Sequence, residues 1–275
     1  MHLDIYQVDS FTTEAFKGNP AGVCISKHGL SENLMLAIAE EMALSETAFL
    51  SLSDMRLRWF TPTTEVSLCG HGTLAVAHVL KERGQLNKGD KVNFETLSGT
   101  LTALVNTNTI ELDFPSPVID LNPTPSPQLL EYLGIQKSEV ISYAHFDSKV
   151  LIELNSEKTL LNLQPNFEAL KQLNGRGVVL TTRSPSDDLD FISRYFAPWV
   201  GVNEDPVTGS AHCALSVYWS KKLAKTQLKG FQASARGGYI TTKLLANGRT
   251  KLIGSAVTVI TGTMQLPTSS AQSME

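Results

Sequence analysis

Apolar and polar residues alternate over short stretches along most of the chain, which is the two-residue period of half-buried β-strands. The alternation predicts ten strands, at residues 4–9, 21–26, 47–52, 91–96, 100–105, 109–114, 150–155, 177–182, 239–245 and 256–262. Two further stretches, RLRWFTPTTE from Arg56 and FISRYFAPWVGVNEDP from Phe191, each read as a strand that runs into a proline-containing turn.

Four segments have the composition of helices instead of strands. Residues 73–83 and 211–223 are apolar almost to their ends, where lysine and arginine suit the negative end of the helix dipole. Residues 31–42 and 167–173 form two more predicted helices. We therefore predict an α+β fold in which a curved, largely antiparallel sheet is rolled around each apolar helix and buries it on all sides.

The chain contains an internal duplication. CGHGTLAVAHVL, from Cys69, and TGSAHCALSVYW, from Thr208, each place a glycine before a run of small and apolar residues, at an offset of 139 residues. The same offset separates two further pairs, Gly99 from Gly238 and Asn108 from Asn247. The duplication predicts two pseudo-symmetric domains of one design.

A proline-rich segment, PSPVIDLNPTPSP, runs from Pro115 to Pro127 and reads as a linker between the two halves. We accordingly expect one domain at residues 1–116 and the other at 117–263. Residues 264–275 are expected to form a tail that can cross back to the first domain, and its end, PTSSAQSME, reads as flexible.

Composition narrows the class of protein. The chain has 275 residues, of which 42% are hydrophobic and 18% charged, and its net charge is −4. No lysine- or arginine-rich run is present, so neither a nucleic acid nor a membrane surface is an expected partner. The chain shows no signal peptide and no apolar stretch of membrane-spanning length, which makes the cytoplasm the expected location.

Cysteine and histidine spacing points to no metal site and no disulfide framework. The three cysteines, Cys24, Cys69 and Cys213, are widely separated, and the six histidines include no HxH or HxxxH pair. Phosphate-binding and serine-hydrolase motifs are also missing from the sequence. We therefore expect no metal and no cofactor.

Each glycine motif stands where a predicted apolar helix begins. The first turn of a helix leaves backbone amides without partners and carries the positive end of the dipole, and together these hold an anion. Two such turns, one from each domain, are expected to face a common cleft that binds a small molecule. The alternative is that each motif is only a helix cap.

Carboxylates near these motifs are candidate proton carriers. Glu46 lies between a predicted helix and an apolar strand, where it is either exposed at the boundary or desolvated with a raised pKa. Glu204 and Asp205 stand just before the second motif. His71, between two glycines, is either a catalytic group or a capping residue.

The two motifs differ in their leading side chain. Cys69 of the first motif corresponds to Thr208 of the second. A threonine hydroxyl cannot exchange protons as a thiol does at neutral pH, so an epimerase that uses two thiols is disfavoured.

Four motifs together resemble the PhzF family of phenazine-biosynthesis isomerases, in order along nearly the whole chain. These are GNPAGV from Gly18, SETAF from Ser45, FTPTTEVSLCGHGTLAVAHVL from Phe60 and NEDPVTGSAHCAL from Asn203. The resemblance implies the diaminopimelate epimerase-like fold, a homodimer, and proton transfer without a cofactor, with Glu46 as general acid and base. It also implies site roles for His71, Asp205 and Ser210, and substrate contacts at Asn19, Gly70, Gly72, Thr73, Gly209 and Ala211.

The expected function is therefore that of a trans-2,3-dihydro-3-hydroxyanthranilate isomerase-like enzyme acting on a small carboxylate. Two alternatives stay open. An amino-acid racemase or epimerase of the same fold would exchange the α proton of a free amino acid with deuterated water. A non-catalytic protein that binds small acids would keep its ligand after the substitution Glu46→Gln.

Overall fold

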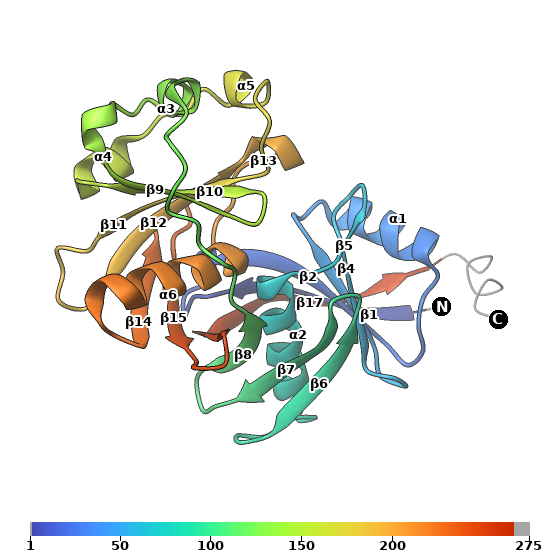
Figure 1. Cartoon of the computed structure of the whole chain (residues 1–275). Coiled ribbons are helices and arrows are strands. Elements are labelled where there is room, and N and C mark those ends of the chain that lie inside the picture. Colours follow the sequence, from blue (N-terminus) through green and yellow to red (C-terminus); the bar gives the residue numbers. More distant parts are fainter. Residues whose placement is uncertain (1, 267–275) are drawn as a thin grey trace. The chain divides into compact units, whose positions relative to one another are not determined.

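The computed structural model describes residues 2–266 of the chain. These residues form two compact units: residues 2–113 with 253–266 make up the first, and Phe114–Leu252 the second (Figure 1). The segment Pro267–Glu275, for which the sequence predicts a flexible tail, lies outside the described residues. Within residues 2–266, no helix is long and apolar enough to cross a membrane.

The first unit is built on a mixed sheet whose strands are mostly antiparallel. Only β2 with β3 and β4 with β6 pair in parallel among the strands of this unit that the structure describes. Its elements are β1 (His2–Ser10), β2 (Asn19–Ser26), α1 (Glu32–Met42), β3 (Thr47–Ser51), β4 (Arg56–Phe60), β5 (Glu65–Val66), α2 (Gly70–Glu82), β6 (Lys91–Thr96), β7 (Gly99–Val105), β8 (Ile110–Pro115) and β17 (Ala256–Gln265).

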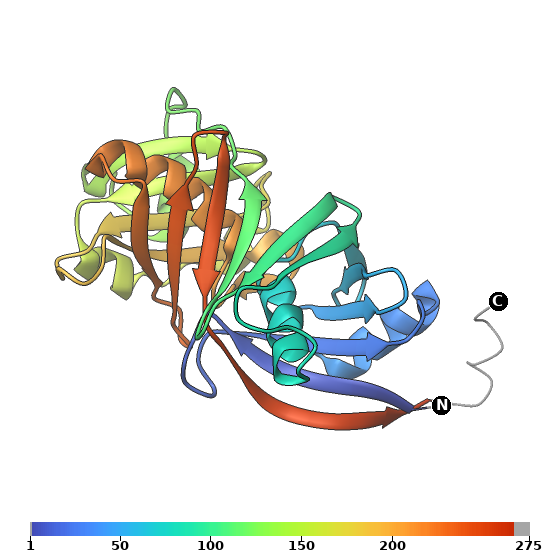
Figure 2. The ribbon, with the colours of Figure 1, turned by 90° about the horizontal axis from the view of Figure 1, so that it is seen from below.

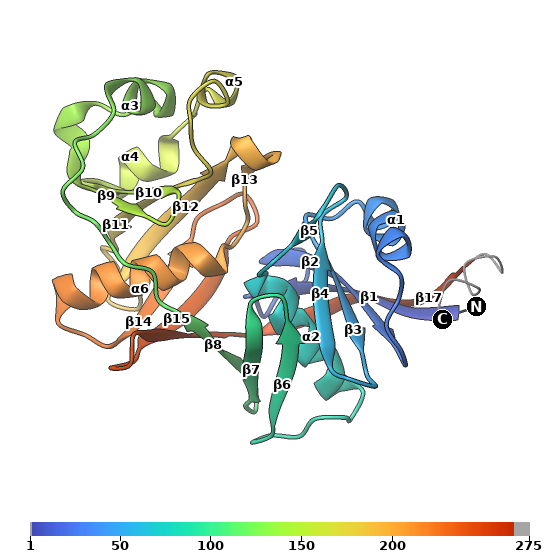
Figure 3. The same ribbon diagram turned by 45° about the vertical axis from the view of Figure 1, so that its right-hand side comes forward.

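Helices cover both faces of this sheet. Phe49 and Phe60 pack in the apolar cluster under α1. Trp59, the neighbour of Phe60 in β4, lies against Gly72 of α2. Since successive residues of a strand point to opposite faces, α1 and α2 lie on opposite sides of β4 (Figure 3). Nearly every side chain of α2 from His71 to Leu80 is buried, as predicted for a helix enclosed by a rolled sheet.

The second unit repeats this plan with extra helices. Its elements are α3 (Pro127–Leu133), a 3₁₀ turn (Lys137–Glu139), β9 (Val140–Phe146), β10 (Lys149–Leu154), α4 (Glu157–Asn162), α5 (Phe167–Leu170), β11 (Val178–Arg183), β12 (Phe191–Ala197), a second 3₁₀ turn (Pro198–Val200), β13 (Val202–Glu204), α6 (Gly209–Leu223), β14 (Gln227–Gln232), β15 (Gly238–Leu244) and β16 (Arg249–Gly254). The parallel pairs β10–β11 and β12–β14 correspond to β2–β3 and β4–β6.

Side chains alternate between two cores in the second unit. Ile152 and Leu180 pack with α3, α4 and α5, whereas Leu151 and Val179 pack with the buried face of α6. The two sets of helices therefore cover opposite faces of the sheet, as Figure 1 shows.

The duplication seen in the sequence is present in the architecture. Corresponding elements begin 139 residues apart at three places: α2 and α6 at Gly70 and Gly209, β7 and β15 at Gly99 and Gly238, and β8 and β16 at Ile110 and Arg249. The α+β fold of two pseudo-symmetric units, predicted from the sequence, is confirmed.

The chain returns to the first unit earlier than the sequence suggested. The chain leaves the first unit after Asp113 and leaves the second unit after Leu252, whereas the sequence placed these two boundaries after residues 116 and 263. The strand β17 runs antiparallel to β1 over the length of both, from Ala256 opposite Ser10 to Gln265 opposite His2 (Figure 2). Alternation of side chains predicts that residues 256–262 form a strand, but it does not tell which sheet edge that strand completes.

The proline-rich segment differs from a free linker. Asp120 forms a bridge with His145 of β9, which fixes the segment to the second unit. Its last proline, Pro127, is the first residue of α3, with Ser126 as the N-cap that accepts a hydrogen bond from the Leu129 amide at 3.3 Å. Proline at the first helical position is favourable, so a residue read as a helix breaker here begins a helix.

Candidate active site

The first half of the candidate site is the N-terminus of α2. Cys69 is the N-cap, and its Sγ accepts a hydrogen bond from the Gly72 amide at 3.4 Å. The Thr73 hydroxyl donates to the Cys69 carbonyl at 2.6 Å, which tightens the first turn. The helix therefore begins at Gly70, three residues before the predicted start at residue 73, because the glycines belong to the helix and not to a preceding turn.

Parallel pairing of β2 with β3 brings Glu46 to this helix. The Gly22 amide donates to the Glu46 carbonyl at 3.1 Å, and Gly22 lies opposite Thr47 in the strand register. The approach is close, since a Cβ on Gly22 would stand 2.7 Å from the Thr47 hydroxyl oxygen. Glu46 is thus held at the start of β3, beside the first turn of α2.

Glu46 and His71 face each other directly. The His71 Nε2 lies 3.3 Å from a carboxylate oxygen of Glu46. On the other side of the ring, the Asn19 amide nitrogen lies 3.4 Å from His71 Nδ1. An amide N–H donated to Nδ1 leaves the ring proton on Nε2, from which it is donated to Glu46. Asn19 therefore selects the tautomer in which His71 binds the carboxylate.

The backbone of His71 is also held in place. The Ser10 hydroxyl donates to the His71 carbonyl at 2.8 Å, and both residues are buried. Ser10 is the last residue of β1 and Asn19 the first of β2, so the two strand ends hold His71 by its backbone carbonyl and by its ring, respectively. Neither supporting contact involves a residue near His71 in the sequence.

Burial sets the protonation behaviour of Glu46. Its side chain is 23% exposed, and that of His71 is 7% exposed. Desolvation raises the pKa of the Glu46 carboxyl above its ordinary value, and the neighbouring Ser45 hydroxyl opposes the rise. Of the two alternatives that the sequence left open, the desolvated carboxylate is the one found.

The expected substrate contacts of the first unit have different surroundings. Asn19 and Thr73 are fully buried, and their polar groups serve His71 and the helix turn. The Gly72 amide is occupied by the Cys69 thiol. Gly70 is half-buried, and within residues 2–266 its amide donates no hydrogen bond, so it is the group of this set best suited to meet a ligand. Direct substrate contact at these positions stays a prediction.

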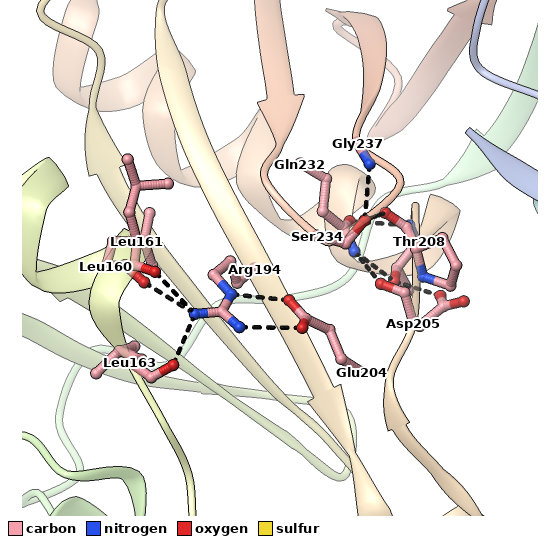
Figure 4. A network of polar contacts seen from close by, with 11 residues as sticks. Leu160, Leu161, Leu163, Arg194, Glu204, Asp205, Thr208, Gln232, Ser234 and Gly237 are labelled. Carbon is pink, nitrogen blue, oxygen red and sulfur yellow. Dashed lines mark hydrogen bonds and ion pairs between the residues drawn. The ribbon is translucent and has the colours of Figure 1, made fainter. Parts of the chain in front are cut away.

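The second half of the candidate site is the N-terminus of α6. The Thr208 hydroxyl donates to the Asp205 carboxylate, and the Thr208 amide donates to the Gln232 side-chain oxygen at 2.9 Å (Figure 4). The Gln232 amide nitrogen in turn donates to the Asp205 carbonyl at 2.6 Å. Asp205 is therefore fixed next to the start of α6 by a residue of β14 that the sequence did not single out.

Ser210 has a partner that the sequence analysis missed. The Lys149 ammonium group donates to the Ser210 hydroxyl oxygen at 3.0 Å. Burial lowers the pKa of Lys149, and the nearby Arg176 acts in the same direction while Asp147 opposes it. Lys149 is the first residue of β10 and is distant from both glycine motifs along the sequence. A lone lysine has no neighbouring sequence pattern that would identify it as a site residue.

Glu204, the other carboxylate before the second motif, is held in an ion pair. Both carboxylate oxygens are held by Arg194, at 2.8 and 3.0 Å, and Arg194 also donates to the carbonyls of Leu160 and Leu163 (Figure 4). Arg58 and Glu65 form the same two-bond pair in the first unit. Because the same pair occurs in both units, we interpret the Arg194–Glu204 pair as part of the repeated fold and Glu204 as a structural residue.

The structure thus sorts the predicted catalytic residues into two groups. Glu46 and His71 are in contact in the first unit, with Cys69 and Asn19 beside them. Asp205 and Ser210 both flank the start of α6 in the second unit, together with Gly209 and Ala211 of its first turn.

Comparison with known proteins identifies the family. The family model of phenazine biosynthesis-like proteins, PhzC-PhzF, matches residues 8–262. An uncharacterized isomerase of Halalkalibacterium halodurans is 49% identical and covers 94% of this chain and 97% of its own length.

Solved structures agree with this assignment. The crystal structure of a phenazine biosynthesis protein of the PhzF family from Enterococcus faecalis is 38% identical, with a TM-score of 0.89 over 97% of this chain and 100% of its own. A hydroxyproline epimerase from Agrobacterium vitis, 12% identical with a TM-score of 0.65 over 96% of this chain and 93% of its own, shares the fold. The chain therefore belongs to the phenazine biosynthesis-like PhzC-PhzF family and is an isomerase.

Proposed function

We propose that this isomerase moves a proton between two carbons of a small unsaturated carboxylic acid without a cofactor, and that Glu46 carries the proton. The observation behind the proposal is the 3.3 Å contact between Glu46 and the buried His71 at the start of α2. The family resemblance suggests dihydro-hydroxyanthranilate or a related acid as the substrate class.

Glu46 is suited to both halves of such a reaction. Burial raises the pKa of the Glu46 carboxyl, which lowers the cost of protonating it, so the group is suited to remove a proton from one carbon and return it to another. The Nε2–H of His71 stabilises the ionised form of Glu46 and keeps the carboxylate in one orientation. Asn19 acts through His71 as a positioning residue.

The substrate carboxylate requires a binding site of its own. In the first unit the candidate for this role is the Gly70 amide at the start of α2. The second unit, taken by itself, has a separate candidate anion site at the first turn of α6, where Gly209 and Ala211 lie. Lys149 adds a positive charge beside Ser210. In this proposal Asp205 and Ser210 bind polar groups of the substrate and take no proton from carbon.

An amino-acid epimerase with two thiols is the weaker candidate. Thr208 occupies the position that would need the second thiol, and its hydroxyl is engaged with the Asp205 carboxylate. In the proposed mechanism a single carboxyl group, that of Glu46, both removes and returns the proton, so no second acid or base is needed.

The test is deuterium uptake from deuterated water into a panel of small acids, including dihydro-hydroxyanthranilate and free amino acids. We expect uptake into an unsaturated acid and a loss of about 10²–10⁴-fold in rate for Glu46→Gln, the usual contribution of a proton-transfer group. Glu41→Gln is the matched control, because Glu41 is exposed at the end of α1. Equal rates for the wild type and Glu46→Gln would refute the assignment of Glu46.

The same panel separates catalysis from binding alone. A non-catalytic acid-binding protein would show calorimetric binding of an acid without deuterium uptake in the wild type. The expected homodimer is checked independently by light scattering coupled to size-exclusion chromatography.

A further inference from the structure

A cavity of about 210 Å³ lies in the first unit, at the opposite end of β3 from Glu46. Ser51, which lines the cavity, is the last residue of β3, whereas Glu46 directly precedes the first. A strand rises about 3.3 Å per residue, so Glu46 and Ser51 lie about 16 Å apart. The cavity is therefore separate from the candidate active site.

The cavity has an apolar floor and a charged rim. Its floor is formed by Leu30, Met35 and Phe49, which are buried in the cluster under α1. Asp54 and Arg56 line the rim, and both are exposed. Sites for small molecules combine apolar walls with a few polar groups in this way, and drug-sized ligands occupy about 300–1,000 Å³. The smaller volume here suits a ligand of only a few carbon atoms.

The two rim residues carry opposite charges. A hydrogen bond from the Ser51 hydroxyl lowers the pKa of Asp54, so this carboxylate is ionised at neutral pH. It accepts the Arg56 backbone amide at 3.3 Å, while the Arg56 guanidinium donates no hydrogen bond within residues 2–266. A ligand with one positive and one negative group would satisfy both side chains.

Arg58, on the same face of β4, adds a second donor to the cavity. Its Nε and Nη2 bind the Glu65 carboxylate, and Nη2 also binds Glu32. Its Nη1 donates no hydrogen bond within the described residues. The charge of Arg58 is thus balanced by two carboxylates, which disfavours a simple anion in the cavity but leaves a donor for a ligand oxygen.

The second unit shows which of these groups the fold itself requires. Arg194 corresponds to Arg58, and its Nη1 donates to two backbone carbonyls, those of Leu160 and Leu163. The fold therefore provides acceptors for this nitrogen in one unit and not in the other.

The charged rim also differs between the units. Thr47 lies opposite Phe60 and Val178 opposite Phe196, so the strand register makes Ile192 the counterpart of Arg56. Ile192 packs in the apolar core of the second unit. The repeated architecture accordingly needs no arginine at this position.

We propose that this cavity binds a free amino acid with a small apolar side chain, such as leucine. A free amino acid carries one positive and one negative charge at neutral pH. Its carboxylate lies against the two arginines, its ammonium group against Asp54, and its side chain on the apolar floor. This inference does not rest on the proposed function, because the cavity does not include Glu46.

Binding is measured by equilibrium dialysis of labelled leucine against the full-length protein, with one molecule expected per chain. Asp54→Asn and Arg56→Met should each weaken leucine binding about 10-fold or more, the effect of losing one charge-assisted hydrogen bond. Leucinamide, N-acetylleucine and glycine should compete at least about 10-fold less well, because each lacks one of the three matched groups.

Arg183→Met is the matched control. Arg183 is an exposed arginine at the end of β11, in the second unit, and its replacement should leave leucine binding unchanged. Absence of leucine binding, equal affinities for leucine and glycine, or binding that neither Asp54→Asn nor Arg56→Met weakens would overturn the inference.

Glu46→Gln separates this cavity from the candidate active site. Leucine binding that survives Glu46→Gln but is weakened by Asp54→Asn supports the cavity, whether or not any acid takes up deuterium. Binding that is lost in Glu46→Gln and kept in Asp54→Asn would place the amino acid at the active site and refute the inference. Absence of deuterium uptake in the wild type would refute the proposed function alone.

Discussion

The indole ring of Trp59 lies directly against Gly72. A Cβ on Gly72 would stand 2.9 Å from Cδ1 of Trp59 and 3.0 Å from Sγ of Cys69. The ring is almost completely buried and cannot move aside without disturbing the sheet. The second glycine of the first motif is thus explained by packing, because only a residue without a side chain lets α2 begin this close to β4.

Gly72→Ala is therefore expected to destabilise the protein. Alanine favours a helix by about 1 kcal/mol over glycine, but overpacking against a rigid ring costs about 1–3 kcal/mol. The displacement also shifts the cap of Cys69 and the neighbouring His71, so activity should fall with stability. Chemical denaturation measures the change in the free energy of unfolding.

Gly29→Ala provides the comparison. A Cβ at Gly29 meets no atom within 4 Å, and the residue is exposed. We expect a change below about 0.5 kcal/mol, as for most surface substitutions. A Gly72→Ala protein as stable and active as Gly29→Ala would contradict the packing explanation.

Replacement of Lys149 tests the anion-binding role proposed for the second unit. Lys149→Met removes the charge beside Ser210 but keeps much of the side-chain volume. We expect KM for the acid identified by deuterium uptake to rise about 10-fold or more with a smaller change in kcat, the signature of lost ground-state binding. Lys158→Met, at an exposed position of α4, should change neither constant. A fall in kcat alone would instead place Lys149 in the chemical step.

The Arg194–Glu204 pair is predicted to be structural. Arg194→Met leaves the Glu204 carboxylate, 21% exposed, without its partner and also removes donors to two carbonyls. A loss of about 3 kcal/mol is expected, since an uncompensated charge costs more than the pair gains. Adding Glu204→Gln should recover part of this loss, measured by urea denaturation of both single variants and the double variant. Strictly additive effects would show that the two groups do not interact.

His212 makes stability depend on pH. It is completely buried in α6, its Nδ1 lies 2.8 Å from the Thr208 carbonyl, and burial lowers its pKa from 6.5 to about 4. Between these values the unfolded chain binds a proton that the folded protein does not. The free energy of unfolding should therefore fall as the pH is lowered from about 6.5 to about 4, by up to about 3 kcal/mol.

The variant His212→Asn isolates this effect. Asparagine can keep the donor to the Thr208 carbonyl but does not titrate, so the variant should be less stable at neutral pH and less sensitive to acid. The measurement is urea denaturation at several pH values. Parallel curves for the wild type and the variant would assign the acid sensitivity to another group.

Local patterns in the sequence were sufficient for the elements and their repetition. Alternation identified most strands, and the shared offset of Gly70 with Gly209 and of Gly99 with Gly238 identified two copies of one design. These features are local because a strand or helix must present apolar residues at its own period wherever it packs. The start of α3 at Pro127 was missed, although its signals were local too, because prolines were read only as breakers.

The tertiary structure alone decided which distant residues meet. Nothing near Lys149 marks it as the partner of Ser210, and nothing near Asn19 marks it as the residue that orients His71. Glu46 reaches His71 because β3 pairs in parallel with β2, and β17 completes the edge of β1. Which strands pair depends on how much apolar surface the whole fold buries, and this quantity cannot be read from any short stretch of sequence.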